Sequence, residues 1–393
     1  MPGLLSLPLD YLLGTTLAAA ATGYLVLALW RVSHSGFERA PRAAFQPPVS
    51  VLKPLCGNEA QLYECLRSFV DQDYPEPQVI FGVADTKDTA IPVVRRLIAE
   101  FPDRDLTLVV DGTIHGTNLK VGNLVNMARH AKHDVIVVSD SDTRIGRDGL
   151  AQVVAPLADP ATGAVTCLYK ASPVGGLASQ LGAMFVNDWF LSSAVVDAGM
   201  REIAYCFGPV SALRRDALDA IGGFAVLGNH LADDFMMGRL VAASGYKVQL
   251  SRAVPHTVVC ESFGSLFRHE LRWARTVKAV KPGEHFMSMV TCPLPLLLVL
   301  LLPHLALGGG AILAGVVSLR IALHYALRVR FDFDSPAVPW LVPLRECLCF
   351  AVWAASFCGS NIRWRHRDFL IGTGGLLLPL PTPIASSATG LGL

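Results

Sequence analysis

The sequence predicts an α/β domain with a parallel sheet, flanked at both ends by apolar segments that enter a membrane. Between about residues 48 and 286, short and nearly continuous apolar runs alternate with helical patterns, which is typical of parallel strands covered on both faces. The ends are apolar, and the 393 residues are 52% hydrophobic and 17% charged, whereas soluble proteins average about 25% charged. We therefore expect a globular domain held at a bilayer.

The first apolar segment, residues 11–30, carries no charge and is about as long as a helix that crosses a bilayer. Arg31, Arg39 and Arg42 follow it, which places this end of the segment in the cytosol. A cleaved signal peptide is the alternative. Its short leading region would normally carry Lys or Arg, but the only charged side chain there is Asp10, so we expect an uncleaved anchor.

The elements of the central part follow in order. Strands are expected at residues 49–52, 78–85, 106–111 and 134–142, with helices between them at 58–69, 91–101 and 120–130, and Asn58 as a candidate cap of the first helix. A fifth strand is expected at 163–169, then a turn and a helix over 208–224, a helix at 230–246 and a basic amphipathic helix at 264–281. The last helix either lies in the headgroup layer or packs its apolar stripe on the core.

Apolar stretches return at residues 288–306, 308–327 and 341–360, and residues 369–384 are apolar but contain Gly and Pro. The basic residues at 328–330 and 363–367 cannot both face the cytosol if 341–360 crosses once, so one segment is expected to be re-entrant or interfacial, with the proline-containing 288–306 as a candidate. The chain thus divides into an anchor and linker (1–46), an α/β domain ending in the amphipathic helix (47–286), and membrane segments with a tail (287–393).

The net charge and the cysteine content argue against some classes of protein and some kinds of site. The net charge of +1 gives no argument for a nucleic-acid partner. The nine cysteines are odd in number and scattered, and no C-x-x-C pair occurs, which argues against a disulfide framework and a zinc site. Reduced thiols in a domain that faces the cytosol are expected.

Three aspartates follow expected strands. Asp85, Asp140 and Asp142 stand at the carboxyl ends, where a parallel sheet binds its ligands. An Asp-x-Asp turn can reach one divalent cation, and Mg²⁺ or Mn²⁺ prefers carboxylates together with phosphate oxygens. The pattern favours a nucleotide-diphosphate substrate, although "DSD" also occurs as a plain turn or helix cap.

Two later motifs each have two interpretations. In "LADDF", Asp233 and Asp234 either complement a helix amino-terminus or include a general base whose pKa is raised by its neighbour. In "HELRW", Arg272 and Trp273 either anchor a helix at the interface or grip a phosphate and wall a site.

Ordered along the chain, these motifs resemble the lipid-directed or processive glycosyltransferases of the GT-A fold, with the pattern D, D-x-D, an acidic pair and (Q/R/H)-x-x-R-W. A finer similarity is to family 21, the ceramide glucosyltransferases, over about residues 10–285. It rests on "VSVLKPLCG", "GVADTKDTAI", "NLKVGNL", "SDSDTRI", "ALRRDALDAIGGF", "LADDF" and "ELRWAR". Within the family, "HLADDF" and "RHELRWARTVKAVKP" look most similar to bacterial hopanoid-biosynthesis glycosyltransferases.

The resemblance implies a GT-A (Rossmann-like) domain, a UDP-sugar donor, Mg²⁺ or Mn²⁺ as cofactor and a membrane lipid as acceptor. It implies these roles: Asp85 at the uracil or ribose, Asp140 and Asp142 at the metal and donor diphosphate, Lys120 near the nucleotide, Asp234 as the base, and Arg272 and Trp273 at the diphosphate close to the membrane. His269 stands where Gln or Arg is commoner, and Asp233 where Glu is common.

The implied reaction is transfer of N-acetylglucosamine from UDP-GlcNAc to bacteriohopanetetrol, at a bacterial inner membrane with the catalytic domain in the cytosol. One base and no second nucleophile indicate a single displacement with inversion. A ceramide glucosyltransferase that uses UDP-glucose is the alternative, followed by a processive polysaccharide synthase. An inactive membrane scaffold and a nucleotide-sensing module are the remaining hypotheses.

Overall fold

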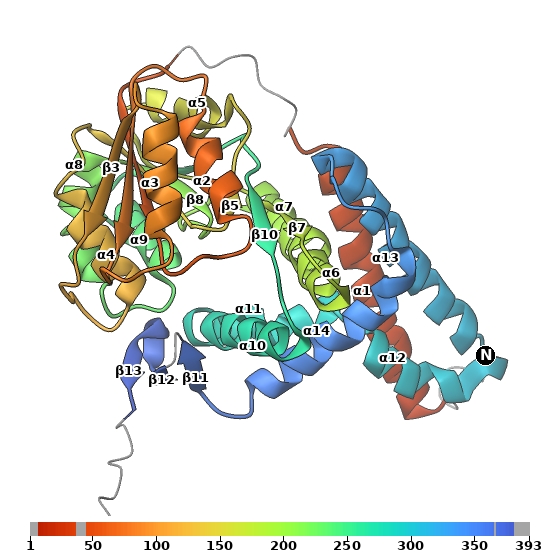
Figure 1. Cartoon of the computed structure of the whole chain (residues 1–393). Helices are drawn as coiled ribbons and strands as arrows, with labels where there is room; N and C mark the ends of the chain where they lie inside the picture. The colour runs from red at the N-terminus through yellow and green to blue at the C-terminus, as the bar shows by residue number, and fades with distance from the viewer. Residues whose placement is uncertain (1–6, 37–44, 365–366, 381–393) are drawn as a thin grey trace, which may run out of the picture.

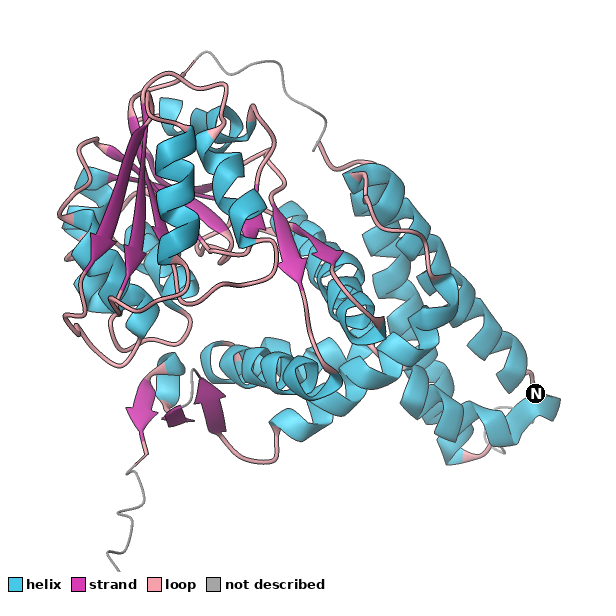
Figure 2. Cartoon of the chain, in the orientation of Figure 1, coloured by secondary structure: helices cyan, strands magenta, loops and turns pink. Residues whose placement is uncertain are grey.

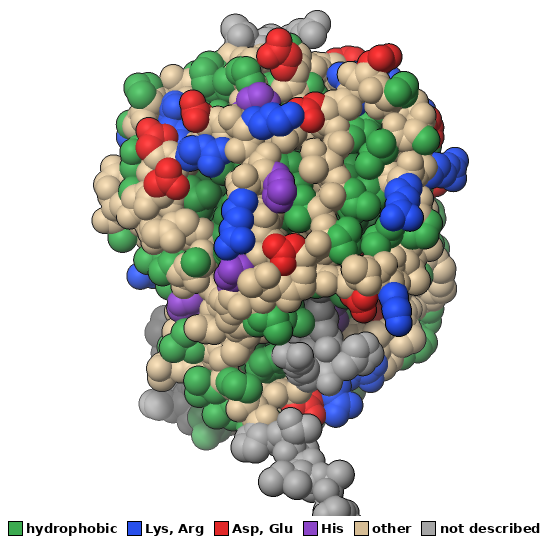
Figure 3. Space-filling model, turned by 60° about the vertical axis from the view of Figure 1, so that its left-hand side comes forward, with side chains coloured by type: hydrophobic (Ala, Val, Ile, Leu, Met, Phe, Trp, Pro, Cys, Tyr) green, Lys and Arg blue, Asp and Glu red, His purple; other side chains and the backbone are tan. Residues whose placement is uncertain are grey.

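A computed structural model describes residues 7–36, 45–364 and 367–380 of the chain. It consists of an α/β domain, a group of long helices beside it, and a small sheet near the carboxyl end (Figures 1 and 2). On the face drawn in Figure 3, acidic and basic side chains lie interspersed over the α/β domain, in keeping with the net charge of +1.

A seven-stranded sheet forms the centre of the domain, with the order β3-β2-β1-β4-β8-β6-β9. Its strands are β1 (Val49–Pro54), β2 (Pro77–Val83), β3 (Asp105–Val110), β4 (Val135–Ser139), β6 (Thr162–Thr166), β8 (Val210–Arg214) and β9 (Lys247–Leu250). Strands β3, β2, β1 and β4 are parallel, whereas β8 runs antiparallel to both β4 and β6. The expected four strands are therefore confirmed, but the sheet is mixed rather than wholly parallel.

The prediction of a turn before the helix at 208–224 was wrong, because that turn is strand β8. Four of its five residues, Val210–Leu213, are buried. A Gly-Pro pair precedes the strand, Arg214 ends it, Arg215 follows it, and Ser211 interrupts its apolar run, so the sequence offers little strand signal.

Helices cover both faces of the sheet (Figure 1). One face carries α2 (Leu62–Val70), α3 (Ile91–Glu100) and α5 (Gly149–Val154); the other carries α4 (Leu119–Ala128), α8 (Arg215–Ala220) and α9 (Asp233–Ala243). Helix α2 begins later than expected: Gln61, at φ 56°, precedes it, and the Asn58 N–H instead donates to Thr89 Oγ1 at 2.9 Å. Asn58 is therefore not the cap.

Two helices in the described residues are long and apolar enough to cross a membrane, α1 (Leu9–Ser33) and α13 (Gly309–Phe331). A bent pair, Pro282–Thr291 and Leu294–Leu307, meets at 59° and matches the expectation of a broken segment near 288–306. Helix α14 (Val342–Ser356) has 15 residues, and the apolar stretch after residue 369 forms strands up to Pro379. The expected segments at 341–360 and 369–384 are therefore not long membrane helices in the part of the chain described.

One helical segment was not predicted. Helix α6 (Leu177–Met184), the π-helical turn η2 (Phe185–Phe190) and α7 (Leu191–Met200) follow one another and pack against α1 and α13. The sequence signal is weak because the π-helical turn breaks the 3.6-residue period and most of the segment is buried.

The remaining elements surround the carboxyl ends of the strands. Helix α10 (Phe263–Val280) begins with a capping box between Ser262 and Ser265. A three-stranded sheet joins β5 (Thr143–Arg144), β10 (His256–Val259) and β7 (Lys170–Pro173), and another joins β11 (Asn361–Trp364), β12 (Arg367–Ile371) and β13 (Leu377–Pro379). The Leu377 N–H donates to Asn229 O at 2.8 Å and the Leu231 N–H to Gly375 O at 2.9 Å, so the segment of the last sheet holds the loop that leads into α9.

Candidate active site

The Asp-x-Asp loop lies where the sequence predicted, directly after strand β4. The Asp140 N–H donates to Pro209 O at 3.1 Å, and Asp142 O accepts from the Val258 N–H at 2.9 Å. The Asp142 side chain accepts from Thr143 Oγ1 at 3.2 Å. Backbone bonds to neighbouring strands thus fix both carboxylates at the edge of the sheet.

Lys120 joins this loop to the start of α9. Its Nζ lies 2.7 Å from Asp140 Oδ1 and 3.4 Å from Asp233 Oδ2, and 16% of its side chain is exposed. Burial opposes the charged ammonium, but the carboxylates of Asp140, Asp233 and Asp234 outweigh it and raise the pKa of Lys120 above its usual range. Asn118 caps the helix that carries Lys120 and donates from Nδ2 to Asp233 Oδ1 at 3.2 Å.

Asp234 and Asp142 carry raised pKa values. Burial and then the charge of Asp233 raise the pKa of Asp234 to about 7, although Lys120 acts in the opposite direction. Burial and then the charges of Asp140 and Glu59 raise the pKa of Asp142 to about 7. A carboxylate with a pKa near the working pH suits a general base, and the expected effect of the acidic pair is present at Asp234.

Gly208 brings the two motifs together. A Cβ atom placed on it would lie 3.1 Å from Asp234 Oδ2 and 3.6 Å from Asp140 Oδ2. One carboxylate of "DSD", Asp140, and one of "LADDF", Asp234, therefore converge on the same stretch of backbone, which the sequence alone did not show.

Lys53 is a neighbour that sequence reasoning missed. It is fully buried, and its Nζ donates to Ser139 Oγ and Thr143 O, each at 3.1 Å, and to Asp140 O at 2.5 Å. Burial lowers the pKa of Lys53 to about 8, although Asp142 and Asp140 act against the shift. A lone lysine inside the apolar run "VSVLKP" was the available signal.

Asp85 lies at the same edge of the sheet but outside this cluster. It is exposed after β2, and its Oδ1 accepts from the Lys87 N–H at 2.9 Å within a turn. Strand β1 stands between β2 and β4, so Asp85 is about 10 Å from the Asp-x-Asp loop across the sheet.

Helix α10 places the "HELRW" motif beside the π-helical turn. The His269 Nδ1 lies 3.0 Å from Glu261 Oε1, and the His269 ring centroid is 4.2 Å from that of Trp273. Trp273 stacks on Phe185 at 5.9 Å. Arg272 precedes Trp273, and its carbonyl accepts from Thr276 Oγ1 at 2.7 Å. The motif thus forms part of a wall between α10 and the helical segment that reaches the membrane helices.

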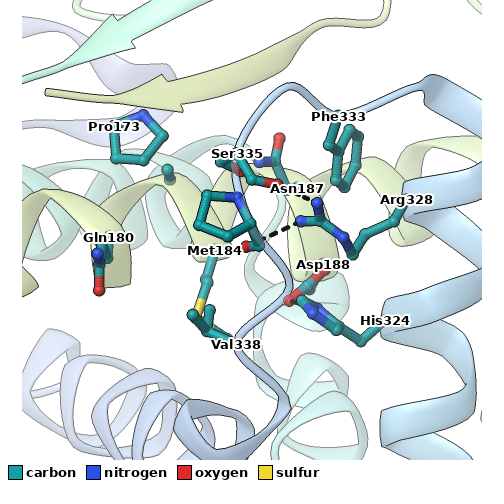
Figure 4. Close-up of a pocket in the computed structure, with 12 residues that line it drawn as sticks. Pro173, Gln180, Met184, Asn187, Asp188, His324, Arg328, Phe333, Ser335 and Val338 are labelled. Carbon is teal, nitrogen blue, oxygen red and sulfur yellow. Dashed lines mark hydrogen bonds and ion pairs between the residues drawn. The ribbon is translucent and has the colours of Figure 1, made fainter.

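A small cavity of about 30 Å³ lies away from the carboxylates, between η2, α13 and the loop at 333–338 (Figure 4). Asp188 Oδ2 lies 2.8 Å from His324 Nδ1, and both side chains are buried. Within the described residues, Asp188 Oδ1 and His324 Nε2 lack a hydrogen-bond partner, and the space suits about one or two water molecules. This pair links η2 to α13 rather than forming part of the carboxylate cluster.

The Asp-x-Asp loop fits a divalent cation. Two carboxylates one residue apart are hard oxygen ligands, and the charge of Asp140 contributes to the raised pKa of Asp142, which shows repulsion that a cation would offset. Among the described residues, no group of three or more His, Cys, Asp or Glu side chains is placed to hold a metal ion. The fit therefore rests on Asp140 and Asp142, with the remaining oxygens expected from a phosphate.

The sequence model of glycosyl transferase family 21 matches residues 13–377. The chain belongs to this family. It is 26% identical over 350 residues to ceramide glucosyltransferase 3 of Caenorhabditis elegans, covering 85% of this chain and 74% of that protein. It is 28% identical over 242 residues to an N-acetylglucosaminyltransferase of Rhizobium leguminosarum bv. viciae, covering 58% of this chain and 55% of that protein.

A mannosyltransferase of Pyrobaculum calidifontis, solved with GDP-Man and Mn²⁺, has a similar structure. The TM-score is 0.54 at 23% identity, covering 89% of this chain and 99% of that one, which supports the fold. The GT-A-like α/β fold with apolar helices at both ends is therefore confirmed, as is the expected enzyme class, a hexosyltransferase of a UDP-sugar-dependent family. The resemblance to ceramide glucosyltransferases is confirmed at the level of the family.

Proposed function

We propose that this family 21 enzyme transfers N-acetylglucosamine from UDP-GlcNAc to a hydroxyl of bacteriohopanetetrol, with inversion. The observation that carries the transfer is the convergence on Gly208 of Asp234, with a pKa near 7, and Asp140 of the Asp-x-Asp loop. The choice of a hopanoid as the acceptor rests on the sequence similarity around "LADDF" and "ELRWAR". Ceramide glucosylation is the second candidate, because the chain is similar to ceramide glucosyltransferases of Caenorhabditis elegans.

In the proposed reaction, the deprotonated Asp234 accepts the proton of the acceptor hydroxyl. The hydroxyl oxygen then bonds to the anomeric carbon as the bond from that carbon to the UDP oxygen breaks, and UDP takes the electron pair. Asp234 is the only base this scheme requires, which fits a single displacement with inversion.

The other residues bind and orient the donor. Asp140 and Asp142 would hold Mg²⁺ or Mn²⁺, which when bound neutralises charge on the departing diphosphate. Lys120 keeps Asp140 and Asp233 in place and adds a positive charge. Asp85, at the carboxyl end of β2, contacts the uracil or ribose, and Arg272 with Trp273 closes the diphosphate side.

The membrane helices bring the acceptor to the site. Arg31 at the end of α1 favours an α/β domain on the cytosolic side of a bacterial inner membrane. Helices α1 and α13 anchor the chain, while α10, which carries Trp273, packs against α14. The reacting hydroxyl then meets Asp234 close to the bilayer surface.

The experiment is UDP release by the purified full-length protein in nanodiscs with Mn²⁺ or Mg²⁺. UDP-GlcNAc and UDP-glucose are each offered with bacteriohopanetetrol or ceramide. Release with UDP-GlcNAc and the hopanoid alone supports the proposal, and release with UDP-glucose and ceramide supports the second candidate. Asp234→Asn should abolish release, while Asp219→Asn, at an exposed position on α8, should not. Turnover that is insensitive to EDTA and to Asp234→Asn contradicts both.

A further inference from the structure

Five aromatic side chains form a continuous arc beside the carboxylates, called the aromatic arc below. Successive ring centroids are 4.5, 5.2, 5.5 and 5.3 Å apart. Each ring is half-buried, unlike the fully covered residues of the two sheet cores. In order, the rings are Tyr169, Phe190, Phe207, Tyr205 and Phe235.

The aromatic arc surrounds the proposed base. Phe207 precedes Gly208, whose backbone faces Asp234, and Phe235 follows Asp234 directly. At the other end, Tyr169 directly precedes strand β7, which pairs with β10, and β10 is bonded to the Asp-x-Asp loop through the Val258 N–H and Asp142 O. One end and the middle of the arc therefore lie next to Asp234, and the other end lies on the sheet that holds the Asp-x-Asp loop.

The aromatic arc is also continuous with the membrane helices. Phe190 and Phe207 pack against the apolar cluster formed by α1, α7, α12 (Leu294–Leu301) and α13. Phe190 ends the π-helical turn that leads into α7, and Tyr205 donates from its hydroxyl to Asp197 on α7 at 2.5 Å. An apolar path thus joins the helices that anchor the chain to the space beside Asp234.

A lysine ammonium group lies beside the last two rings of the aromatic arc, Tyr205 and Phe235. Lys281 Nζ lies 4.3 Å from the Tyr205 ring centroid and 5.6 Å from that of Phe235. It also pairs with Glu284 at 3.1 Å. Apolar rings with a charged edge fit a molecule that is apolar along its length and polar at one end.

We propose that the aromatic arc is the acceptor site, and that it holds the apolar carbons next to the reacting hydroxyl of a membrane lipid alcohol. The proposal rests on the proposed function and adds the surface that selects the acceptor. The donor sugar is the competing occupant. The continuity of Phe190 and Phe207 with the membrane-helix cluster favours the lipid, since the donor is water-soluble.

Photo-cross-linking tests the site without requiring turnover. p-Benzoylphenylalanine is placed at Phe207, at Phe235 and, as a matched control, at Phe101, which is also half-buried but packs on the first sheet core away from the arc. Full-length protein in nanodiscs is irradiated with alkyne-tagged bacteriohopanetetrol or alkyne-tagged ceramide. We expect lipid adducts at Phe207 and Phe235 and few at Phe101. Equal labelling at the three positions, or none at the arc, overturns the proposal.

Kinetics separate the acceptor site from the donor site. Phe207→Leu should raise the acceptor KM about tenfold while the donor KM changes less than about twofold, because one aromatic contact is lost. Phe101→Leu should change neither. A rise confined to the donor KM would assign the arc to the sugar and overturn the proposal. Lipid adducts at the arc in a protein that transfers no sugar would contradict the proposed function alone.

Discussion

Removing the charge of Glu270 should destabilise the packing of α10 on the membrane-side helices. Glu270 is 3% exposed and Arg345 of α14 is 0% exposed. Arg345 Nη1 donates to Glu270 Oε1 at 2.7 Å, and Nη2 donates to Oε2 at 2.6 Å. Arg345 also donates to Leu181 O of α6 at 3.1 Å, so three helices meet at one guanidinium.

The magnitude follows from this burial. Glu270→Gln leaves a buried guanidinium without its countercharge, which typically costs about 3–5 kcal/mol. With an unfolding entropy of about 2 cal/mol/K per residue, 393 residues give roughly 0.8 kcal/mol/K, so the Tm should fall by about 5 °C. Replacing both partners, Glu270→Leu with Arg345→Met, leaves no unpaired charge and should cost much less than Glu270→Gln.

The assay is thermal unfolding of the full-length protein in detergent, followed by tryptophan fluorescence. Glu270→Leu, Arg345→Met and the double variant form a cycle that isolates the energy of the pair, and Glu270→Gln is measured beside them. Glu284→Gln, on an exposed carboxylate that pairs with Arg201, is the matched control and should shift the Tm by less than about 1 °C. If Glu270→Gln and the control shift the Tm equally, the pair is not buried as the structure has it and the reasoning fails.

Four further predictions concern the reacting groups. Asp234→Asn should lower kcat about 1,000-fold, because it removes the base. In the wild-type enzyme, the rate of transfer should fall about tenfold per pH unit below pH 7, because protonation of the Asp234 carboxyl, whose pKa is raised, also removes the base. A pH–rate profile checks this dependence. Lys120→Met removes the cation that lowers the pKa of Asp234, so the acidic limb of that profile should move up by about one unit, and a downward move would contradict the assignment. Asp142→Asn should raise at least about tenfold the Mn²⁺ concentration that gives half-maximal activity, as measured by metal titration. Gly208→Ala places a Cβ atom 3.1 Å from Asp234 Oδ2, so it should lower kcat about tenfold and leave the Tm unchanged. An unchanged kcat would mean that the Asp234 side chain moves away from the added methyl group without an effect on the reaction.

The sequence predicted where the aspartates lie in the fold, because local features set these positions. Asp140 and Asp142 follow a run of apolar residues, and the end of a parallel strand is set by a few neighbours. Asp233 and Asp234 begin helix α9 as expected. The convergence of Asp140 and Asp234 on Gly208 depends on strand β8 lying antiparallel beside β4, a pairing between residues more than 70 positions apart.

Other features had no local signal. Glu270 lies within "HELRW" as an ordinary polar residue of an amphipathic helix, and its partner Arg345 is 75 residues away in an apolar stretch. Lys53 directly follows the strand predicted at residues 49–52, and it is fully buried with its ammonium bonded to Asp140 O of the Asp-x-Asp loop. Pairings of this kind follow from the tertiary packing rather than from residue period or spacing.

Two buried polar pairs outside the carboxylate cluster lie where the α/β domain meets the long helices. Glu270 with Arg345 joins α10 to α14, and Asp188 with His324 joins η2 to α13. Apolar helices packed only by small and branched side chains can slide along one another, whereas a buried polar pair forms its hydrogen bonds in one register. Trp273 stands three positions after Glu270, and Phe190 two after Asp188. A slip of either helix would therefore displace a wall of the site relative to Asp234, whose position is set by the sheet.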